Sequence, residues 1–159
     1  MNFQELLAPS DPAIDIEEAL ESWRWLIPEP VILLAMTAFG DLFVIAADGS
    51  VLFLDTAAGS CCRVAESRMG WQELLGDKEQ VEQWFMPALL TQLLSNGVSL
   101  AEGQCFTPKR SICFGGELIP GNWQPGSWRV HLYRLGQLHE QLKDLPDGAR
   151  ITKINFTPM

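Results

Sequence analysis

Basic residues are scarce in this chain, above all in its N-terminal part. Its 159 residues include 11 Lys and Arg against 20 Asp and Glu, which gives a net charge of −9 at pH 7. Residues 1–60 contain ten acidic residues and one basic residue, Arg24, whereas residues 103–159 contain four acidic and seven basic residues. A surface of this sign repels phosphate backbones and attracts basic partners. The composition therefore excludes a general nucleic-acid binder.

Long apolar runs and targeting signals are also lacking. The longest nearly apolar run, residues 30–39, is about half as long as the ~20 residues that a membrane-spanning helix needs. The N-terminal sequence MNFQELLAPSDPAIDIEE has no basic stretch followed by an apolar one, as a secretory signal peptide would. We therefore predict a protein that has no membrane partner and that resides in the cytoplasm.

Residues that bind metals or act as nucleophiles are few. The four cysteines include one adjacent pair, Cys61 and Cys62, and no C-x-x-C motif, so we expect buried free thiols. The two histidines, His131 and His139, do not form an H-E-x-x-H motif. The sequence therefore predicts neither a metal site nor a cofactor nor a catalytic set, and we expect that the protein is not an enzyme.

The apolar content is sufficient for one folded domain. Hydrophobic residues make up 47% of the chain and charged residues 19%, and a domain typically has ~100–200 residues. We predict a single domain over residues 1–159. The expected fold class is α+β, with an antiparallel or mixed sheet that contains a β-meander at about 42–65 and packs against several helices.

An amphipathic helix is predicted near the N-terminus, over residues 15–27. Its apolar residues recur at helical spacing, and Pro28 and Pro30 end it. The acidic residues fall on the solvent-facing side together with Trp25. We leave two interpretations of Trp25 open, namely packing against the turn at Pro28 or exposure as an anchor for a partner.

Periodicity and turn signals predict the other elements. Asp48-Gly49 between two apolar runs indicates a hairpin, and Pro87 should kink its helix or begin a new one. The predicted strands span residues 42–47, 51–55, 61–65, around 111–118, 128–133 and 150–156. The predicted helices span residues 15–27, 70–75, 77–95 and 135–143.

Five ordered motifs occur along the chain. They are FGDLF at 39–43, GQCF at 103–106, GGE at 115–117, LGQLH at 135–139 and KDLPDG at 143–148. Together they resemble the C-terminal domain of the type VI secretion DNase-immunity proteins, a domain that often follows a GAD-like domain. The resemblance covers about residues 30–155 and leaves residues 1–29 as an acidic N-terminal segment with an amphipathic helix. The motif residues are Gly40, Asp41, Gly103, Gln104, Gly115, Gly116, Glu117, Gly136, Gln137, His139, Asp144, Pro146 and Gly148.

The resemblance implies a non-enzymatic bacterial protein that binds and neutralises a cognate toxin, which could be a nuclease. The motif residues are mostly types that set turns and cores, so we expect them to be structural. Because a nuclease needs a basic surface, the acidic helix is the candidate partner-binding surface. Its residues are Asp15, Glu17, Glu18, Glu21 and Trp25. The alternative is a stand-alone regulatory or small-ligand binding domain.

Overall fold

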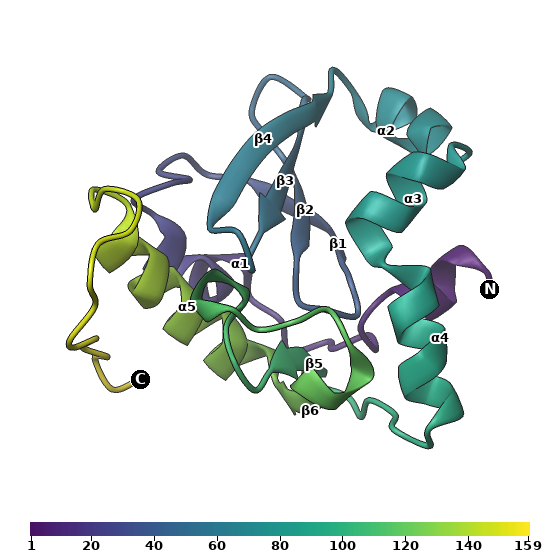
Figure 1. The fold of residues 1–159 in the computed structure, drawn as a ribbon. Coiled ribbons are helices and arrows are strands. Elements are labelled where there is room, and N and C mark those ends of the chain that lie inside the picture. The colour runs from purple at the N-terminus through teal and green to yellow at the C-terminus, as the bar shows by residue number, and fades with distance from the viewer.

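A four-stranded antiparallel sheet lies in the middle of the structure, a computed structural model that describes residues 1–159 (Figure 1). The strands follow one another in the order β1-β2-β3-β4. This order confirms the predicted meander, and the hairpin at Asp48-Gly49 joins its β2 and β3. The strands are β1 (Ile32–Met36), β2 (Leu42–Ile45), β3 (Val51–Asp55) and β4 (Ser60–Ala65).

The first strand of the sheet, β1, was not among the predicted strands. β1 lies within the apolar run at 30–39 and pairs with β2, with Ile32 opposite Ile45. A continuous apolar run without alternation has no period that distinguishes a strand from a helix. This is the reason why β1 was not predicted.

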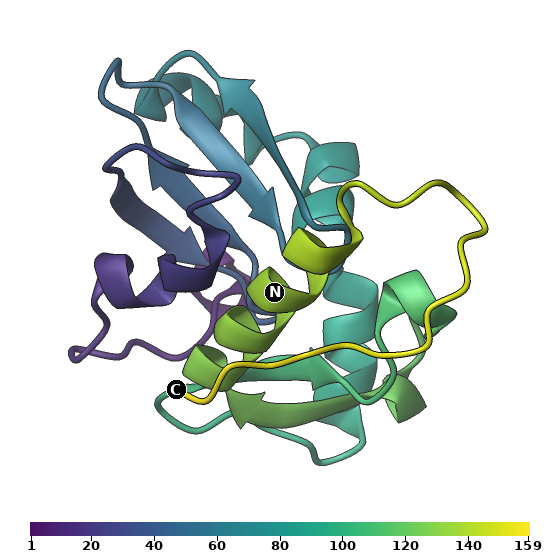
Figure 2. The same ribbon diagram turned by 90° about the vertical axis from the view of Figure 1, so that its left-hand side faces the viewer.

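Helices cover both faces of the sheet (Figures 1 and 2). Side chains alternate along a strand, so Phe43 and Phe53 face one side of the sheet and Leu42 and Leu54 face the other. The first side packs against α2 (Arg68–Leu74), α3 (Lys78–Phe85) and α4 (Pro87–Ser95). The second side packs against α1 (Ile16–Ala19), the 3₁₀ helix η2 (Glu21–Trp23) and α5 (Trp128–Leu142). The predicted α+β class is confirmed.

A small second sheet closes one end of the structure. Its two antiparallel strands are β5 (Gln104–Pro108) and β6 (Trp123–Ser127). The backbone N–H of Phe106 donates to the carbonyl of Ala38 at 2.7 Å, and this bond joins the small sheet to the end of β1. The N-terminal 3₁₀ helix η1 (Phe3–Leu6) leads into the same junction, where Leu7 forms a bridge with Thr37.

The strand predicted around 111–118 is wrong. The segment contains the 3₁₀ helix η3 (Ile112–Phe114) and a tight bend, followed by η4 (Pro120–Asn122). The Asn122 side-chain amide donates to the carbonyls of Arg110 and Glu117, so these carbonyls are satisfied without a strand partner. A Cβ atom on Gly116 would overlap the backbone carbonyl of Arg110. The adjacent glycines therefore allow one stretch of backbone to approach another.

The strand predicted at 128–133 is also wrong, because α5 runs without a break from Trp128 to Leu142. Ser127 caps the start of this helix by accepting from the N–H of Val130. The buried face of α5 includes His131, Gly136 and His139, and none of these three is a hydrophobic residue. The helical period was therefore hidden in the first half of α5, and the helix predicted at 135–143 is only its second half.

The helix predicted at 15–27 is interrupted. After α1, Leu20 adopts φ −101° and ψ 6°, and η2 follows. Next to this break, the Ser22 hydroxyl and the Trp23 indole N–H both donate to the carbonyl of Leu132 on α5, at 3.0 and 2.8 Å. Contacts with α5 therefore replace the regular helical ladder, while the apolar side chains still face the core as predicted.

Pro87 begins a new helix, one of the two outcomes that the sequence predicted. Met86 ends α3 in the left-handed region with φ 46°, and Pro87 is the first residue of α4. The predicted stop at Asn96 and Gly97 is confirmed, since Asn96 caps α4 and Gly97 has φ 80°. Ser67 caps α2, so the helix predicted at 70–75 begins two residues earlier.

The strand predicted at 150–156 is absent, and the C-terminal tail runs back along α5 instead (Figure 2). Gln141 exchanges two hydrogen bonds with the backbone of Asn155, at 2.8 and 3.0 Å. Gln137 makes two similar bonds with the backbone of Thr157. Side-chain amides of a helix thus take the place of a neighbouring strand.

The four cysteines are free, but only Cys105 is buried; Cys61 is half-buried, and Cys62 and Cys113 are exposed, so the expectation of buried thiols holds for one of the four. Burial, and next the nearby charge of Asp41, raises the pKa of the Cys105 thiol.

None of the helices combines the length and the apolar character that a bilayer-crossing helix requires.

Candidate functional site

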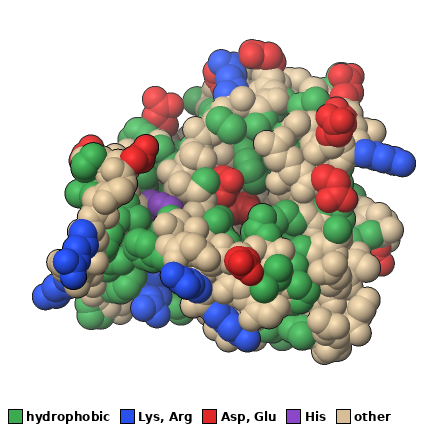
Figure 3. Space-filling model, in the orientation of Figure 1, with side chains coloured by type: hydrophobic (Ala, Val, Ile, Leu, Met, Phe, Trp, Pro, Cys, Tyr) green, Lys and Arg blue, Asp and Glu red, His purple; other side chains and the backbone are tan.

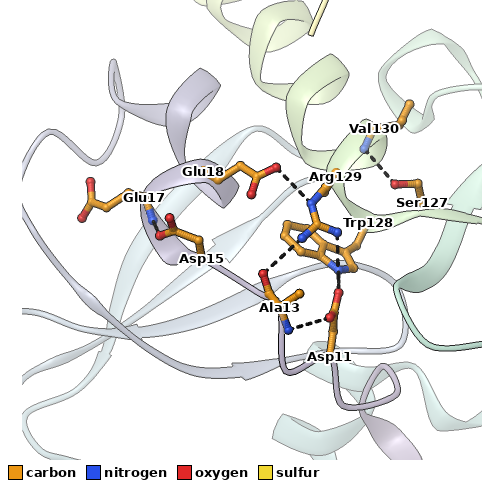
Figure 4. Close-up of polar contacts among 9 residues, drawn as sticks. All are labelled: Asp11, Ala13, Asp15, Glu17, Glu18, Ser127, Trp128, Arg129 and Val130. Atoms are coloured by element: carbon orange, nitrogen blue, oxygen red, sulfur yellow. Dashed lines mark hydrogen bonds and ion pairs between the residues drawn. The ribbon is translucent and has the colours of Figure 1, made fainter.

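Arg129 on α5 forms ion pairs with two carboxylates of the N-terminal segment (Figure 4). Its Nε lies 2.9 Å from Glu18 Oε1, and its Nη1 lies 3.7 Å from Asp11 Oδ2. Its Nη2 donates to the carbonyl of Ala13 at 3.1 Å, and its guanidinium carbon lies 4.4 Å from the ring centre of Trp128. Arg129 therefore fastens the acidic segment to the long helix.

Asp11 supports the same junction from the other side. Its Oδ2 accepts from the indole N–H of Trp128 at 2.8 Å, and its Oδ1 accepts from the N–H of Ala13 at 2.9 Å. The bond from Trp128 is the main reason why the pKa of Asp11 is lowered. Asp11 was not predicted as a site residue, because Trp128 and Arg129, which contact its side chain, lie more than a hundred residues away in the sequence.

Other acidic residues of the candidate surface also have partners within the chain. Asp15 caps α1 by accepting from the N–H of Glu17 at 2.9 Å. Glu17 forms an ion pair with Arg24. The exposed carboxylates of Glu21 and Glu29 form no ion pair, and Asp15 is also exposed and forms none. We call Asp15, Glu21 and Glu29 the open carboxylates.

Trp25 is half-buried at the seam between the acidic segment and α5. Its ring stacks on Trp23 at a centroid distance of 6.0 Å, and its indole N–H donates to the carbonyl of Gly136 at 3.2 Å. The Lys143 ammonium lies 5.5 Å from the ring centre. Trp25 therefore holds the segment onto α5 while part of its ring remains accessible.

Replacing Arg129 with Gln should loosen the acidic segment without unfolding the domain. The change removes both ion pairs and the cation over Trp128, so we expect the amide of Ala13 to exchange its hydrogen about two to five times faster. Hydrogen exchange measured by NMR reports this change. Arg134→Gln, also on α5 but without an ion pair to this segment, is the control. Equal exchange rates in both variants would show that Arg129 does not fasten the segment.

Asp41 lies in a buried chain of hydrogen bonds that the sequence did not predict. Its Oδ1 accepts from the backbone N–H and the hydroxyl of Thr56, at 2.8 and 2.7 Å. The same hydroxyl lies 3.0 Å from His131 Nε2, and His131 Nδ1 lies 2.9 Å from the hydroxyl of Thr107. Asp41 and His131 are only 6% and 4% exposed. The chain of bonds thus connects the large sheet, α5 and the small sheet.

Burial changes the pKa of both ionisable members of this chain. Burial, and then the charge of Asp55, raises the pKa of Asp41 to about 7, while burial lowers the pKa of His131 to about 4. When Asp41 is ionised, one arrangement pairs every donor: Thr107 donates to His131 Nδ1, His131 Nε2–H donates to Thr56, and Thr56 donates to Asp41. A neutral His131 therefore fits the site.

The family-motif residues make contacts within the domain. Gln104 accepts from the N–H of Ala101, and the carbonyl of Gly103 accepts from the N–H of Trp128. His139 Nε2 lies 3.1 Å from the carbonyl of Thr56. These contacts support the expected structural role of the motifs. The remaining motif residues lie in turns and loops at Gly40, Gly115, Gly116, Glu117, Asp144, Pro146 and Gly148, and on α5 at Gly136 and Gln137.

The fold and the surface together define an α+β domain with an acidic N-terminal segment fastened to its longest helix. Residues 65–139 match the family described as the T6SS immunity protein Tdi1, C-terminal, where T6SS denotes the type VI secretion system. The match confirms the family resemblance that the motifs indicated, over a shorter stretch than the expected 30–155. The acidic segment lies outside the matched residues.

The crystal structure of Atu4351 from Agrobacterium tumefaciens is similar to this chain, with a TM-score of 0.45 and 16% sequence identity. The similarity covers 66% of this chain and 53% of that one, so the chain spans about half of the length of that protein. No protein with a curated description matches the sequence.

Proposed function

We propose that this chain is a bacterial immunity protein without enzymatic activity, which binds and neutralises a cognate toxin in the cytoplasm. The observation that carries the proposal is the match of residues 65–139 to an immunity-protein family. The net charge of −9 further favours a basic toxin, such as a nuclease.

The toxin would contact the acidic segment. The open carboxylates Asp15, Glu21 and Glu29 are exposed and have no ion pair to break when a basic partner arrives. Glu17 and Glu18 would have to exchange Arg24 and Arg129 for a partner cation, so they should contribute less. The accessible part of Trp25 would lie at the edge of the contact.

Capture of the tagged chain from its native host, followed by mass spectrometry, tests whether a toxin is bound. We then expect the triple variant Asp15→Asn, Glu21→Gln, Glu29→Gln to bind that toxin about tenfold more weakly at low salt, with a shallower salt dependence. The matched control neutralises three other exposed acids, Glu73, Glu82 and Glu140. Equal affinity of the two triple variants would contradict the proposed surface, and capture of no toxin would contradict the proposed function.

A role as a small-ligand binding domain is the second candidate, because the domain contains a cavity with charged and aromatic lining residues. The two functions are compatible, since the cavity does not include any of the open carboxylates. Each can therefore be tested without the other.

A further inference from the structure

Lys143, which caps the end of α5, is a base without a carboxylate partner. The chain contains 20 acidic residues, and ion pairs with them are formed by Arg24, Arg63 and Arg129. Lys143 is exposed and forms none. Most of the Lys and Arg side chains visible in the space-filling view lie along its lower and left borders, below most of the acidic ones (Figure 3). The Lys143 ammonium lies over an aromatic ring instead, 5.5 Å from the centre of Trp25.

The Trp25 ring is held in place from within the protein. Trp23, which is fully buried, stacks on it with an angle of 24° between the two ring planes. The indole N–H of Trp25 is fixed by its bond to the carbonyl of Gly136. A tryptophan ring attracts a cation through the negative charge of its π face, and it does so better than other aromatic rings. The accessible part of Trp25 is therefore a fixed platform on which a cation of this chain already lies.

Negative charge flanks this platform in the sequence. Two of the open carboxylates, Glu21 and Glu29, lie four residues before and four residues after Trp25. Arg24, the nearest base in the sequence, pairs with Glu17 and donates to the backbone carbonyl of Glu29 rather than to its carboxylate. The surroundings of Trp25 therefore carry uncompensated negative charge, which adds to the attraction that the ring exerts on a cation.

We propose that Trp25 is the platform for an arginine side chain of the basic partner, and that Lys143 occupies this place while the partner is absent. The inference rests on the proposed toxin contact, to which it adds the chemical group that is recognised. A guanidinium is flat and more weakly hydrated than an ammonium, so it stacks on an aromatic ring better than Lys143 does. The guanidinium displaces the ammonium, and the open carboxylates Glu21 and Glu29 balance its charge.

Two small compounds test the platform in the intact chain without a toxin. Nα-acetyl-arginine amide carries a guanidinium, and Nα-acetyl-citrulline amide is its neutral counterpart of nearly the same shape. We expect the arginine compound to shift the NMR signal of the Trp25 indole N–H in a saturable way, and the citrulline compound to bind about fivefold or more weakly. The Trp25→Phe variant assigns this signal. The signal of Trp71, which packs on the other side of the sheet, should not move.

A pair of lysine variants tests the displacement. Lys143→Ala clears the ring, so the arginine compound should bind about two- to fivefold more tightly, in keeping with the weak attraction of a cation to an exposed ring. Lys78→Ala removes an equal charge from an exposed position at the start of α3, on the other side of the sheet, and should leave the affinity unchanged. If Lys143→Ala bound no more tightly than Lys78→Ala, or if both compounds bound equally well, the proposal would be overturned.

The captured toxin separates this inference from the proposed function. We expect Trp25→Phe to weaken toxin binding about fivefold or more and Lys143→Ala to strengthen it about two- to fivefold. A toxin whose affinity is the same for the natural protein and for Lys143→Ala would overturn the place of its arginine on Trp25 and leave the proposed function standing. Saturable binding of the arginine compound without capture of any toxin would support the platform and contradict the function.

Discussion

The Asp41→Asn variant should be least stable, relative to the natural protein, at acidic pH. The pKa of Asp41 is raised from 3.8 to about 7, so the folded state retains a proton that the unfolded chain has lost. The stability that this proton contributes is fully present below pH 3.8 and is lost as the pH rises through about 7. The shift corresponds to about 4 kcal/mol between the two limits. Removing Asp41 removes this pH dependence.

The His131→Gln variant should show the opposite dependence. Burial lowers the pKa of His131 from 6.5 to about 4, so the unfolded chain takes up a proton that the folded state does not. The stability that neutral His131 contributes is present above pH 6.5 and is lost as the pH falls through about 4, by about 3 kcal/mol. Between about pH 4 and pH 6.5, the pH dependences of the two contributions cancel in the natural protein. In this range folding removes one proton from His131 and adds one to Asp41, so the total number of bound protons does not change.

Urea unfolding at several pH values between about 4 and 8 measures both effects as differences from the natural protein. The difference for Asp41→Asn should shrink as the pH rises, and the difference for His131→Gln should grow. Asp147→Asn, which removes an exposed carboxylate without a hydrogen-bond partner, serves as the control. If the difference in stability from the natural protein stayed constant with pH in both variants, the buried chain of hydrogen bonds would be contradicted.

Replacing Gly136 with Ala should destabilise the domain by about 2–3 kcal/mol. A Cβ atom at this position would lie 2.5 Å from the backbone oxygen of Ser22 and 2.8 Å from its carbonyl carbon. In an exposed helix the same change would stabilise the protein by up to ~1 kcal/mol. A loss of stability in Gly136→Ala would therefore indicate that η2 lies close to α5. The backbone of Ser22 has to move, which also disturbs the bonds from Ser22 and Trp23 to Leu132.

Gly121→Ala is the control for this change, because a Cβ atom there meets nothing within 4 Å. We expect its stability to stay within about 0.5 kcal/mol of the natural protein. Denaturant unfolding followed by circular dichroism compares the two variants. A Gly136→Ala protein as stable as the Gly121→Ala protein would mean that the two elements are not in close contact.

Local signals in the sequence predicted their elements well. The hairpin at Asp48-Gly49 and the stop at Asn96-Gly97 are defined by a few adjacent residues, and both are present in the structure. The errors arose where distant partners decide the conformation. The tail at 150–156 has the composition of a strand but pairs with Gln137 and Gln141 on a helix.

The candidate site was predicted only as a charge pattern. The sequence located the acidic segment, but it could not show that Glu17 and Glu18 are paired, since one of their partners lies on α5. The chain of hydrogen bonds from Asp41 to His131 was not predictable either, because Thr56 and His131 are 75 residues apart. The only signal for it was a polar residue on the buried face of α5, at a position that the sequence assigned to a strand.

Beyond the side-chain contacts of Trp128 and Arg129 with residues 11–18, a second contact attaches residues 22–25 to main-chain atoms of α5. The indoles of Trp23 and Trp25 donate to the carbonyls of Leu132 and Gly136, which any residue would offer at those positions if its side chain left room. At this second contact the two tryptophans supply the side-chain donors, and α5 supplies backbone carbonyls and the space around them. Outward-facing side chains of α5 that do not contact the segment, unlike Trp128, Arg129 and Lys143, can accordingly be exchanged for labels or cross-linkers while residues 22–25 keep their place.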